Sequence, residues 1–210
     1  VDHSGGLRAV MAMQPQADVL TSVALTHPMM VGLRAGACHQ GQRWQWDGVE
    51  FEVLHPPASL ADDRASKPNA HSCVLRIRAA DGVNALLVGD IEAEQERRLL
   101  AAGALTRTNW LLVPHHGSKT SSIPEFVRAV DPRIVIYPVG YRNRFGHPHV
   151  DVEQRYLLQG SHVYRSDRDG AVTVNLGAAE TINVTPHRAT YRRYWQTPLV
   201  NDPVADSDDY

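Results

Sequence analysis

Short apolar runs alternate with amphipathic stretches through the later part of the chain. Each run is bounded by turn-forming residues, a pattern typical of buried strands. These runs predict strands at 73–77, 85–88, 110–113, 134–137, 162–165 and 171–176. Residues 92–102, 124–130 and 150–159 have helical periodicity instead. Strands alternating with helices predict an α/β fold, and the hairpins add antiparallel pairs, so we expect a mixed sheet.

The first part of the chain predicts a helix, a strand and a hairpin. Ser4 is a typical N-cap for a helix over 4–15, and residues 18–25 have the composition of a strand. A loop rich in Gly, His and Pro follows. Residues 44–53 then alternate apolar and polar side chains around an Asp-Gly turn, which predicts a β-hairpin.

Length and charge limit the classes of protein to consider. The chain has 210 residues, 21 Lys plus Arg against 23 Asp plus Glu, and 43% apolar residues. This composition excludes a wholly disordered chain, and the balanced charge argues against a bulk electrostatic nucleic-acid binder. No apolar run approaches the roughly 18 residues that a membrane helix needs. Periodicity stops after Gly177, so we predict one domain over 1–177 and a poorly ordered tail over 178–210.

The two cysteines, Cys38 and Cys73, allow two interpretations. Each lies near a predicted strand, so they could form one disulfide in an oxidising compartment. They could equally be two buried thiols. Two cysteines alone build neither a metal site nor a disulfide scaffold.

Metal-binding residue types gather next to the predicted strands and helices. Asp2 and His3 come just before the first helix, and Asp90 ends a buried strand. His115 and His116 follow another buried strand, and His147 lies in a loop. Such positions combine a rigid backbone with side chains that reach a cleft.

Simpler explanations exist for several of these residues. An Asp-His pair is common on protein surfaces, and Asp90 could be only the N-cap of the next helix. The arginines of the 140–148 loop could be ordinary surface charge. The other histidines have no metal-type neighbours, apart from His71, which is ambiguous: they are His27, His39, His55, His162 and His187.

The order of these motifs resembles a known family. It runs Asp2-His3-Ser-Gly-Gly, Asn69-x-x-Ser72, Gly-Asp90, Pro-His115-His116-Gly-Ser118 and Asn-Arg144-Phe-Gly-His147-Pro. This is similar to the metallo-β-lactamase-like C-terminal domain of ComEC-type DNA-internalisation competence proteins. The segment 38–57 resembles the proteobacterial branch.

The resemblance implies an αββα sandwich with mixed sheets. In the family, Asp2 and His3 are the last members of a His-x-Asp-x-Asp-His motif. The earlier members, and the strands before them, are not in this sequence. We therefore expect a fragment truncated within the metal motif and missing its N-terminal strands. The membrane-spanning channel part of the parent protein is also absent, so the fragment itself is expected to be soluble.

The resemblance also implies a metal centre. Asp2 and His3 would ligate one metal of a pair, Asp90 would bridge both, and His147 would complete the set. Either His115 or His116 would lie beside the cluster, and the choice stays open. Carboxylate and imidazole ligands suit Mn²⁺ or Zn²⁺. Two ions about 3.5–4 Å apart would activate water and neutralise the charge of a phosphate.

Further roles follow from the same resemblance. The implied catalytic residues are Asp2, His116 and Ser118. The implied phosphate-binding residues are Ser118, Lys119, Arg142 and Arg144. No nucleotide cofactor is expected.

The expected function is hydrolysis of phosphodiester bonds in incoming DNA during transformation. The expected partners are single-stranded DNA and the membrane channel portion of the parent, an inner-membrane protein whose domain would face the periplasm. Two alternatives remain: a non-catalytic module that guides DNA through the channel, and a small-molecule metallohydrolase of the same superfamily. An open groove would favour DNA, and a narrow closed pocket would favour a small substrate.

Overall fold

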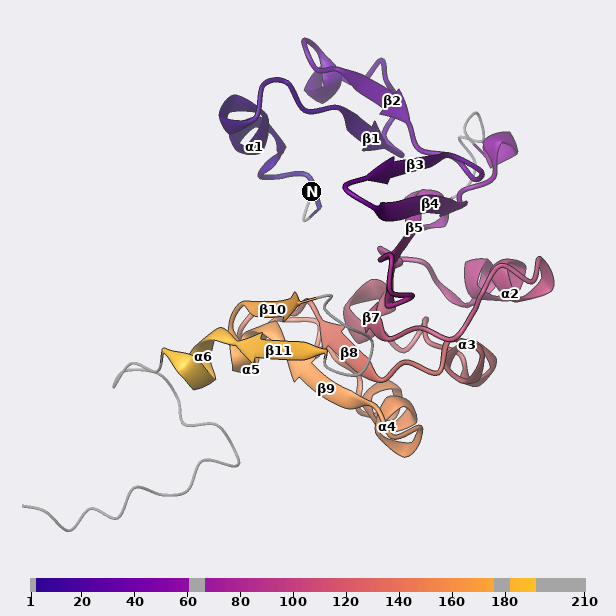
Figure 1. Ribbon diagram of the computed structural model, residues 1–210, viewed down its shortest axis with the longest axis vertical. Coiled ribbons are helices and arrows are strands. Elements are labelled where there is room, and N and C mark those ends of the chain that lie inside the picture. The colour runs from indigo at the N-terminus through magenta and orange to yellow at the C-terminus, as the bar shows by residue number, and fades with distance from the viewer. Residues whose placement is uncertain (1–2, 61–66, 176–181, 192–210) are drawn as a thin grey trace, which may run out of the picture.

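A seven-stranded mixed sheet forms the centre of the protein (Figure 1). The computed structural model describes residues 3–60, 67–175 and 182–191. The strand order is β3-β4-β5-β6-β7-β8-β9, antiparallel from β3 to β6 and parallel from β6 to β9. The strands are β3 (Arg43–Trp46), β4 (Val49–His55), β5 (Val74–Arg78), β6 (Asn84–Leu87), β7 (Trp110–Leu112), β8 (Ile134–Tyr137) and β9 (His162–Arg165). The predicted α/β class with a mixed sheet is confirmed.

Three helices pack against one face of this sheet. They are α2 (Ala93–Ala101), α3 (Pro124–Val130) and α4 (Val150–Leu158), each connecting two neighbouring parallel strands. Leu86, Leu111 and Val135 lie side by side in the register of β6, β7 and β8 and are buried under these helices. Phe126 and Tyr156 complete this core from the helices.

The opposite face of the sheet is also apolar, but it is only partly covered. Leu75, Leu87, Leu112 and Tyr164 belong to the alternate positions of their strands. All four side chains remain partly exposed in the described structure. Because successive strand residues point to opposite faces, an apolar residue at every position gives a sheet with two apolar sides.

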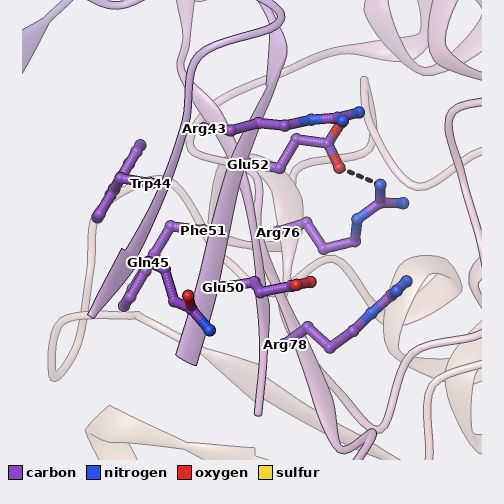
Figure 2. A pocket seen from close by; sticks show the side chains of 8 residues that line it. All are labelled: Arg43, Trp44, Gln45, Glu50, Phe51, Glu52, Arg76 and Arg78. Atoms are coloured by element: carbon purple, nitrogen blue, oxygen red, sulfur yellow. Dashed lines mark hydrogen bonds and ion pairs between the residues drawn. The ribbon is translucent and has the colours of Figure 1, made fainter. Parts of the chain in front are cut away.

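The hairpin β3–β4 extends the sheet beyond the helices, and its two faces differ in character. Trp44 and Phe51 stack with ring centroids 5.1 Å apart. Figure 2 shows the charged side chains on the other side of the strands, where Glu52 pairs with both Arg43 and Arg76. Partial burial acts to raise the pKa of Glu52, but hydrogen bonds from the two arginines hold it below its ordinary value.

The N-terminal segment forms a small unit apart from helices α2–α4 (Figure 1). It contains α1 (Leu7–Met13), β1 (Val19–Thr21), the 3₁₀ turn η1 (Pro28–Met30) and β2 (Ala35–Ala37), with β1 and β2 parallel. Strand β2 lies inside the stretch that periodicity assigned to a loop. Its Ala-Gly-Ala sequence has no hydrophobic alternation, so only pairing with β1 reveals it.

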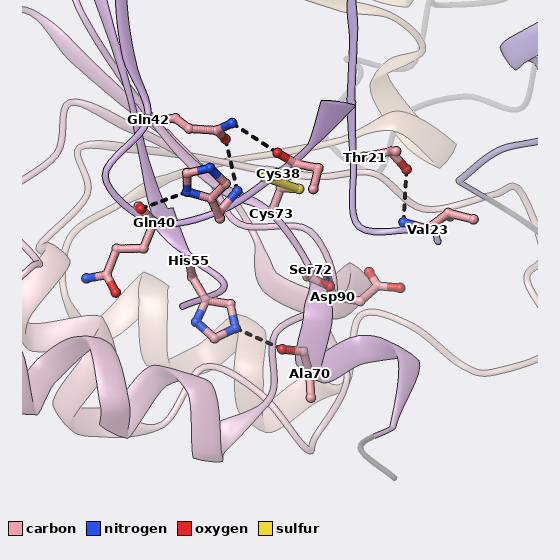
Figure 3. The surroundings of a disulfide bond; sticks show 12 residues. Thr21, Val23, Cys38, Gln40, Gln42, His55, Ala70, Ser72, Cys73 and Asp90 are labelled. Carbon is pink, nitrogen blue, oxygen red and sulfur yellow. Dashed lines mark hydrogen bonds between the residues drawn. A yellow bond between two sulfur atoms is a disulfide. The ribbon is translucent and has the colours of Figure 1, made fainter. Parts of the chain in front are cut away.

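A disulfide joins this segment to the sheet. Cys38 and Cys73 are bonded, with Cα atoms 6.2 Å apart. Cys38 follows β2 and Cys73 immediately precedes β5. Of the two interpretations of the cysteines, the structure therefore supports the bridge (Figure 3).

The remaining elements are short. They are η2 (Ala58–Leu60), η3 (Pro68–His71), η4 (Pro114–Gly117), α5 (Ser166–Asp169), β10 (Val172–Asn175), β11 (Asn183–Pro186) and α6 (His187–Thr190). β11 pairs antiparallel with β10, within the stretch that the sequence assigned to a tail. Residues 192–210 lie outside the described part of the chain. In the described ranges, no helix is both long enough and apolar enough to cross a membrane.

Candidate metal centre

The loop that follows β7 carries two consecutive histidines on a left-handed backbone. His115 and His116 have φ angles of +49° and +57°, and Gly117 follows at +79°. Left-handed φ is uncommon for residues with a side chain and is found most often at functional sites. A Cβ atom on Gly117 would lie 2.6 Å from the Tyr137 ring and 2.7 Å from Pro148. Only glycine therefore lets the loop approach β8 so closely.

His116 directs its Nε2 atom toward Asp90. The His116 Nδ1 atom lies 2.7 Å from the carbonyl oxygen of Pro138. Since a carbonyl oxygen only accepts, Nδ1 carries the proton, and in the neutral ring the lone pair is on Nε2. The His116 Nε2 atom is 3.5 Å from Asp90 Oδ1. Two electron-rich atoms thus face each other, an arrangement that a cation between them would stabilise.

Asp90 is positioned by the end of the sheet and not by helix capping. It follows Gly89, and its backbone N–H donates to the Ser72 hydroxyl over 3.1 Å. The N-cap of α2 is Glu92, whose backbone N–H donates to Gln95 Oε1 over 3.1 Å. The interpretation of Asp90 as a helix cap is therefore wrong, and its carboxylate faces the histidines.

His3 completes a group of three ligand-type side chains. Its Nε2 atom is 2.8 Å from Asp90 Oδ2, and its ring centroid is 5.4 Å from that of His116. Potential ligand atoms of His3, Asp90 and His116 all lie within 4.8 Å of one another. Two imidazole nitrogens and one carboxylate oxygen are a donor set that fits Zn²⁺ or Mn²⁺, and three protein ligands leave a position for substrate or water. Asp2 lies outside the described residues.

His115 faces a different partner from its neighbour. Its Nδ1 atom is 3.3 Å from Thr120 Oγ1 and 3.5 Å from Glu92 Oε1. The amide of Asn69 donates to the same Glu92 oxygen over 3.2 Å. Of the two histidines, the geometry therefore favours His116 as a ligand. The sequence analysis did not single out Glu92 as a residue of the site. A second carboxylate only two residues after Asp90 could have indicated it.

His147 borders the same region without joining the group of three. It shares a cavity of about 360 Å³ with His115, His116, Asn143 and Phe145. Its ring centroid is 6.1 Å from that of His115. Burial lowers the pKa of His147; His115 and His116 would lower it further when they carry a proton, whereas the Asp90 carboxylate acts to raise it. Its role as a ligand stays a prediction.

The predicted phosphate-binding residues have different surroundings. Ser118 is buried, and its hydroxyl oxygen lies 3.2 Å from Thr120 Oγ1. Lys119, Arg142 and Arg144 are exposed on the two loops that flank the histidines. From these positions the two arginines and the lysine can bind a ligand that approaches from solvent. The Ser118 hydroxyl, in contrast, already forms a hydrogen bond with Thr120 of its own loop.

The disulfide lies next to this candidate centre. Ser72, which holds the backbone of Asp90, is adjacent to Cys73 in the chain. Figure 3 shows Cys38, Cys73, Ser72 and Asp90 in one region of the structure. The same covalent link that attaches the N-terminal segment is thus close to Asp90, the residue that His3 contacts.

Comparison with known proteins gives several curated relatives. The chain is 34% identical over 198 residues to Competence protein ComA of Neisseria gonorrhoeae, covering 93% of this chain and 26% of that protein. It is 33% identical over 175 residues to Recombination protein 2 of Haemophilus influenzae, covering 83% and 21%. It is 35% identical over 133 residues to ComE operon protein 3 of Bacillus subtilis, covering 63% and 16%.

The other comparisons are less informative. No family model matches the chain. A solved structure from Parabacteroides distasonis, described as a metal-dependent hydrolase, is 12% identical with a TM-score of 0.40, covering 63% of this chain and 58% of that one. The chain spans about a quarter or less of the length of the curated relatives it matches. At 33–35% identity, the chain is a homologue of part of the competence proteins of the ComEC family.

Proposed function

We propose that this chain is a metal-dependent hydrolase domain of metallo-β-lactamase type, which cleaves phosphodiester bonds in incoming DNA. The observation that carries this proposal is the convergence of His3, Asp90 and His116. Competence and recombination relatives support DNA as the substrate class. The proposed parent protein is an inner-membrane channel for DNA.

The residues around the centre support the proposed chemistry. His3, Asp90 and His116 would hold a divalent ion, and the hydrogen bond to the Pro138 carbonyl keeps His116 in the orientation that ligation needs. A bound divalent ion would supply stabilisation of negative charge on the phosphate and would lower the pKa of water.

Hydrolysis also requires proton movement. Water forms a new bond to phosphorus and loses a proton, while the bond from phosphorus to the leaving sugar oxygen breaks and this oxygen gains a proton. His115 is the group that we propose to carry this proton, because Thr120 and Glu92 hold its ring at the edge of the cavity. Arg142 and Arg144 would bind non-bridging phosphate oxygens.

Metal content and DNA cleavage test the proposal. We expect the purified chain to bind Mn²⁺ or Zn²⁺ and to cleave single-stranded DNA, and we expect Asp90→Asn to weaken metal binding and abolish cleavage. Asp151→Asn is a matched control, because that carboxylate is exposed on α4. Cleavage that survives Asp90→Asn would contradict the hydrolase. A chain that binds DNA but no metal would favour the guiding module.

The disulfide supports a location for the domain. Disulfides persist in oxidising compartments such as the bacterial periplasm and are rare in the cytosol. The Cys38–Cys73 bond therefore supports a domain that faces the periplasm. Labelling with a thiol reagent in intact cells tests this. We expect Cys38 and Cys73 to stay unlabelled because they are bonded to each other, and labelling of both would contradict the proposed location.

A further inference from the structure

The loop between β8 and α4 presents aromatic side chains to solvent beside the candidate metal centre. Phe145 is 68% exposed and Tyr141 is 58% exposed. Phe145 lines the cavity that also contains His115, His116 and His147. Exposed aromatic rings are unfavourable in water, so rings held at the mouth of a site point to a ligand that covers them.

Hydrogen bonds hold this loop in a defined shape. The side chain of Asn143 accepts from the backbone N–H of His147 over 2.9 Å and donates to the carbonyl of His147 over 2.7 Å. The backbone N–H of Asn143 donates to the carbonyl of Gly140 over 3.1 Å. A preorganised loop loses little entropy when a ligand binds. Phe145 is therefore an exposed ring on a fixed support.

Cations and aromatic rings are interleaved along the loop. The Phe145 ring stacks on the His147 ring, with centroids 5.9 Å apart and planes inclined by 19°. The Arg144 guanidinium lies 5.0 Å from the Phe145 centroid, and the Arg142 guanidinium lies 5.3 Å from that of Tyr141. Single-strand binding sites combine the same two components, aromatic rings that stack on bases and cations that track the phosphates.

We infer that Phe145 is a stacking platform for an unpaired nucleobase next to the phosphate that the candidate metal centre would cleave. Arg144, whose guanidinium lies over the ring, binds the phosphate of the stacked nucleotide. This inference rests on the proposed function and deepens it, because it names the side chain that would hold a base of the single strand. Bases in a duplex are already stacked on one another and cannot lie on Phe145 without being unpaired.

The flanking arginines favour a nucleic acid over an apolar partner. An apolar protein surface would require Arg142 and Arg144 to lose their hydration without compensation. A single strand offers both a flat ring for Phe145 and negative charge for the guanidinium groups. Loss of base stacking by alanine substitution costs about 1–3 kcal/mol per base, which corresponds to about 5- to 150-fold in affinity.

Binding without metal separates this inference from the hydrolase. The probes are a fluorescent oligothymidylate and an abasic strand of the same length, both measured with the full chain in EDTA. We expect Phe145→Ala to weaken oligothymidylate binding by about 5- to 150-fold and to leave abasic binding unchanged. Phe145→Trp should restore the preference for bases, and Arg144→Ala should weaken both probes.

The controls make the experiment decisive. Leu158→Ala removes another exposed apolar side chain, at the end of α4, and should change neither probe. Equal effects of Phe145→Ala on both probes would overturn the inference, as would a wild-type chain with no preference for bases. A preference for bases that depends on Phe145, in a chain without cleavage activity, would uphold the platform and contradict only the hydrolase.

Discussion

The helix-covered body and the N-terminal segment contribute to one candidate site but are built very differently. In the body, side chains such as Leu111, Val135 and Phe126 are completely buried. Among described residues 3–37, the buried apolar side chains are Met11 and Met30. The body places Asp90 and His116, whereas the thinly packed segment places His3. The comparison indicates that the geometry of the candidate centre is fixed by packing on one side and depends on a covalent link on the other.

Matched leucines in the two regions should show the largest difference. Leu111→Ala creates a cavity under the helices and is expected to lower the free energy of unfolding by about 2–5 kcal/mol. Leu20→Ala, on β1, removes a side chain that is 43% exposed and should cost about 0.5 kcal/mol or less. Urea denaturation measures both. Equal costs would mean that the segment is packed as tightly as the body.

Loss of the disulfide should affect the segment before the body. Cys38→Ser combined with Cys73→Ser is expected to cost about 2–4 kcal/mol of stability. Amide hydrogen exchange should increase over residues 19–37 and stay slow at Leu111 and Val135. Metal affinity should fall as well, because His3 is held less firmly. If exchange over 19–37 did not change, the segment would be held by its own contacts and not by the bridge.

The last effect is a pH dependence that belongs to the body alone. Burial raises the pKa of Glu96 to about 7, against hydrogen bonds from the Ile123 and Ser122 backbone that lower it. Between pH 4.5 and 7 the folded chain holds a proton that the unfolded chain has lost. The stability that Glu96 contributes is therefore complete below pH 4.5 and is lost as the pH rises through 7.

Denaturation curves for the wild type and Glu96→Gln test this assignment. The wild type should lose stability relative to the variant between about pH 5 and pH 7.5, because the variant has no carboxyl group to ionise. Exchange in the N-terminal segment should not follow this trend. Parallel stability profiles for the two proteins would show that Glu96 does not titrate in this range.

Sequence patterns predicted the body better than the segment. Apolar runs such as 110–113 and 134–137 identify buried strands because both faces of the sheet are apolar there. β2 carries only small residues, and the polar β11 is defined by its pairing with β10. Neither has a periodicity from which it could be found, since strand pairing is set by tertiary contacts.

The candidate site divides in the same way. The sequence singled out His3, Asp90 and the His115-His116 pair because these residue types follow or precede regular elements. It could not distinguish a helix cap from a ligand at Asp90, and it could not choose between the two histidines. Both questions depend on the path of the backbone. The helix begins after Glu92, so Asp90 is not its cap, and the left-handed turn at His115 sends the two histidine side chains toward different partners.

The glycine that follows the two histidines affects how genetic data on this protein should be interpreted. Gly117 has no side chain to offer a ligand, yet any replacement would collide with Tyr137 and Pro148. A screen for loss of the proposed activity would therefore recover position 117 as readily as Asp90. Assays of folding are needed to distinguish substitutions that distort the loop, such as those at Gly117, from substitutions that remove a metal-binding or catalytic group.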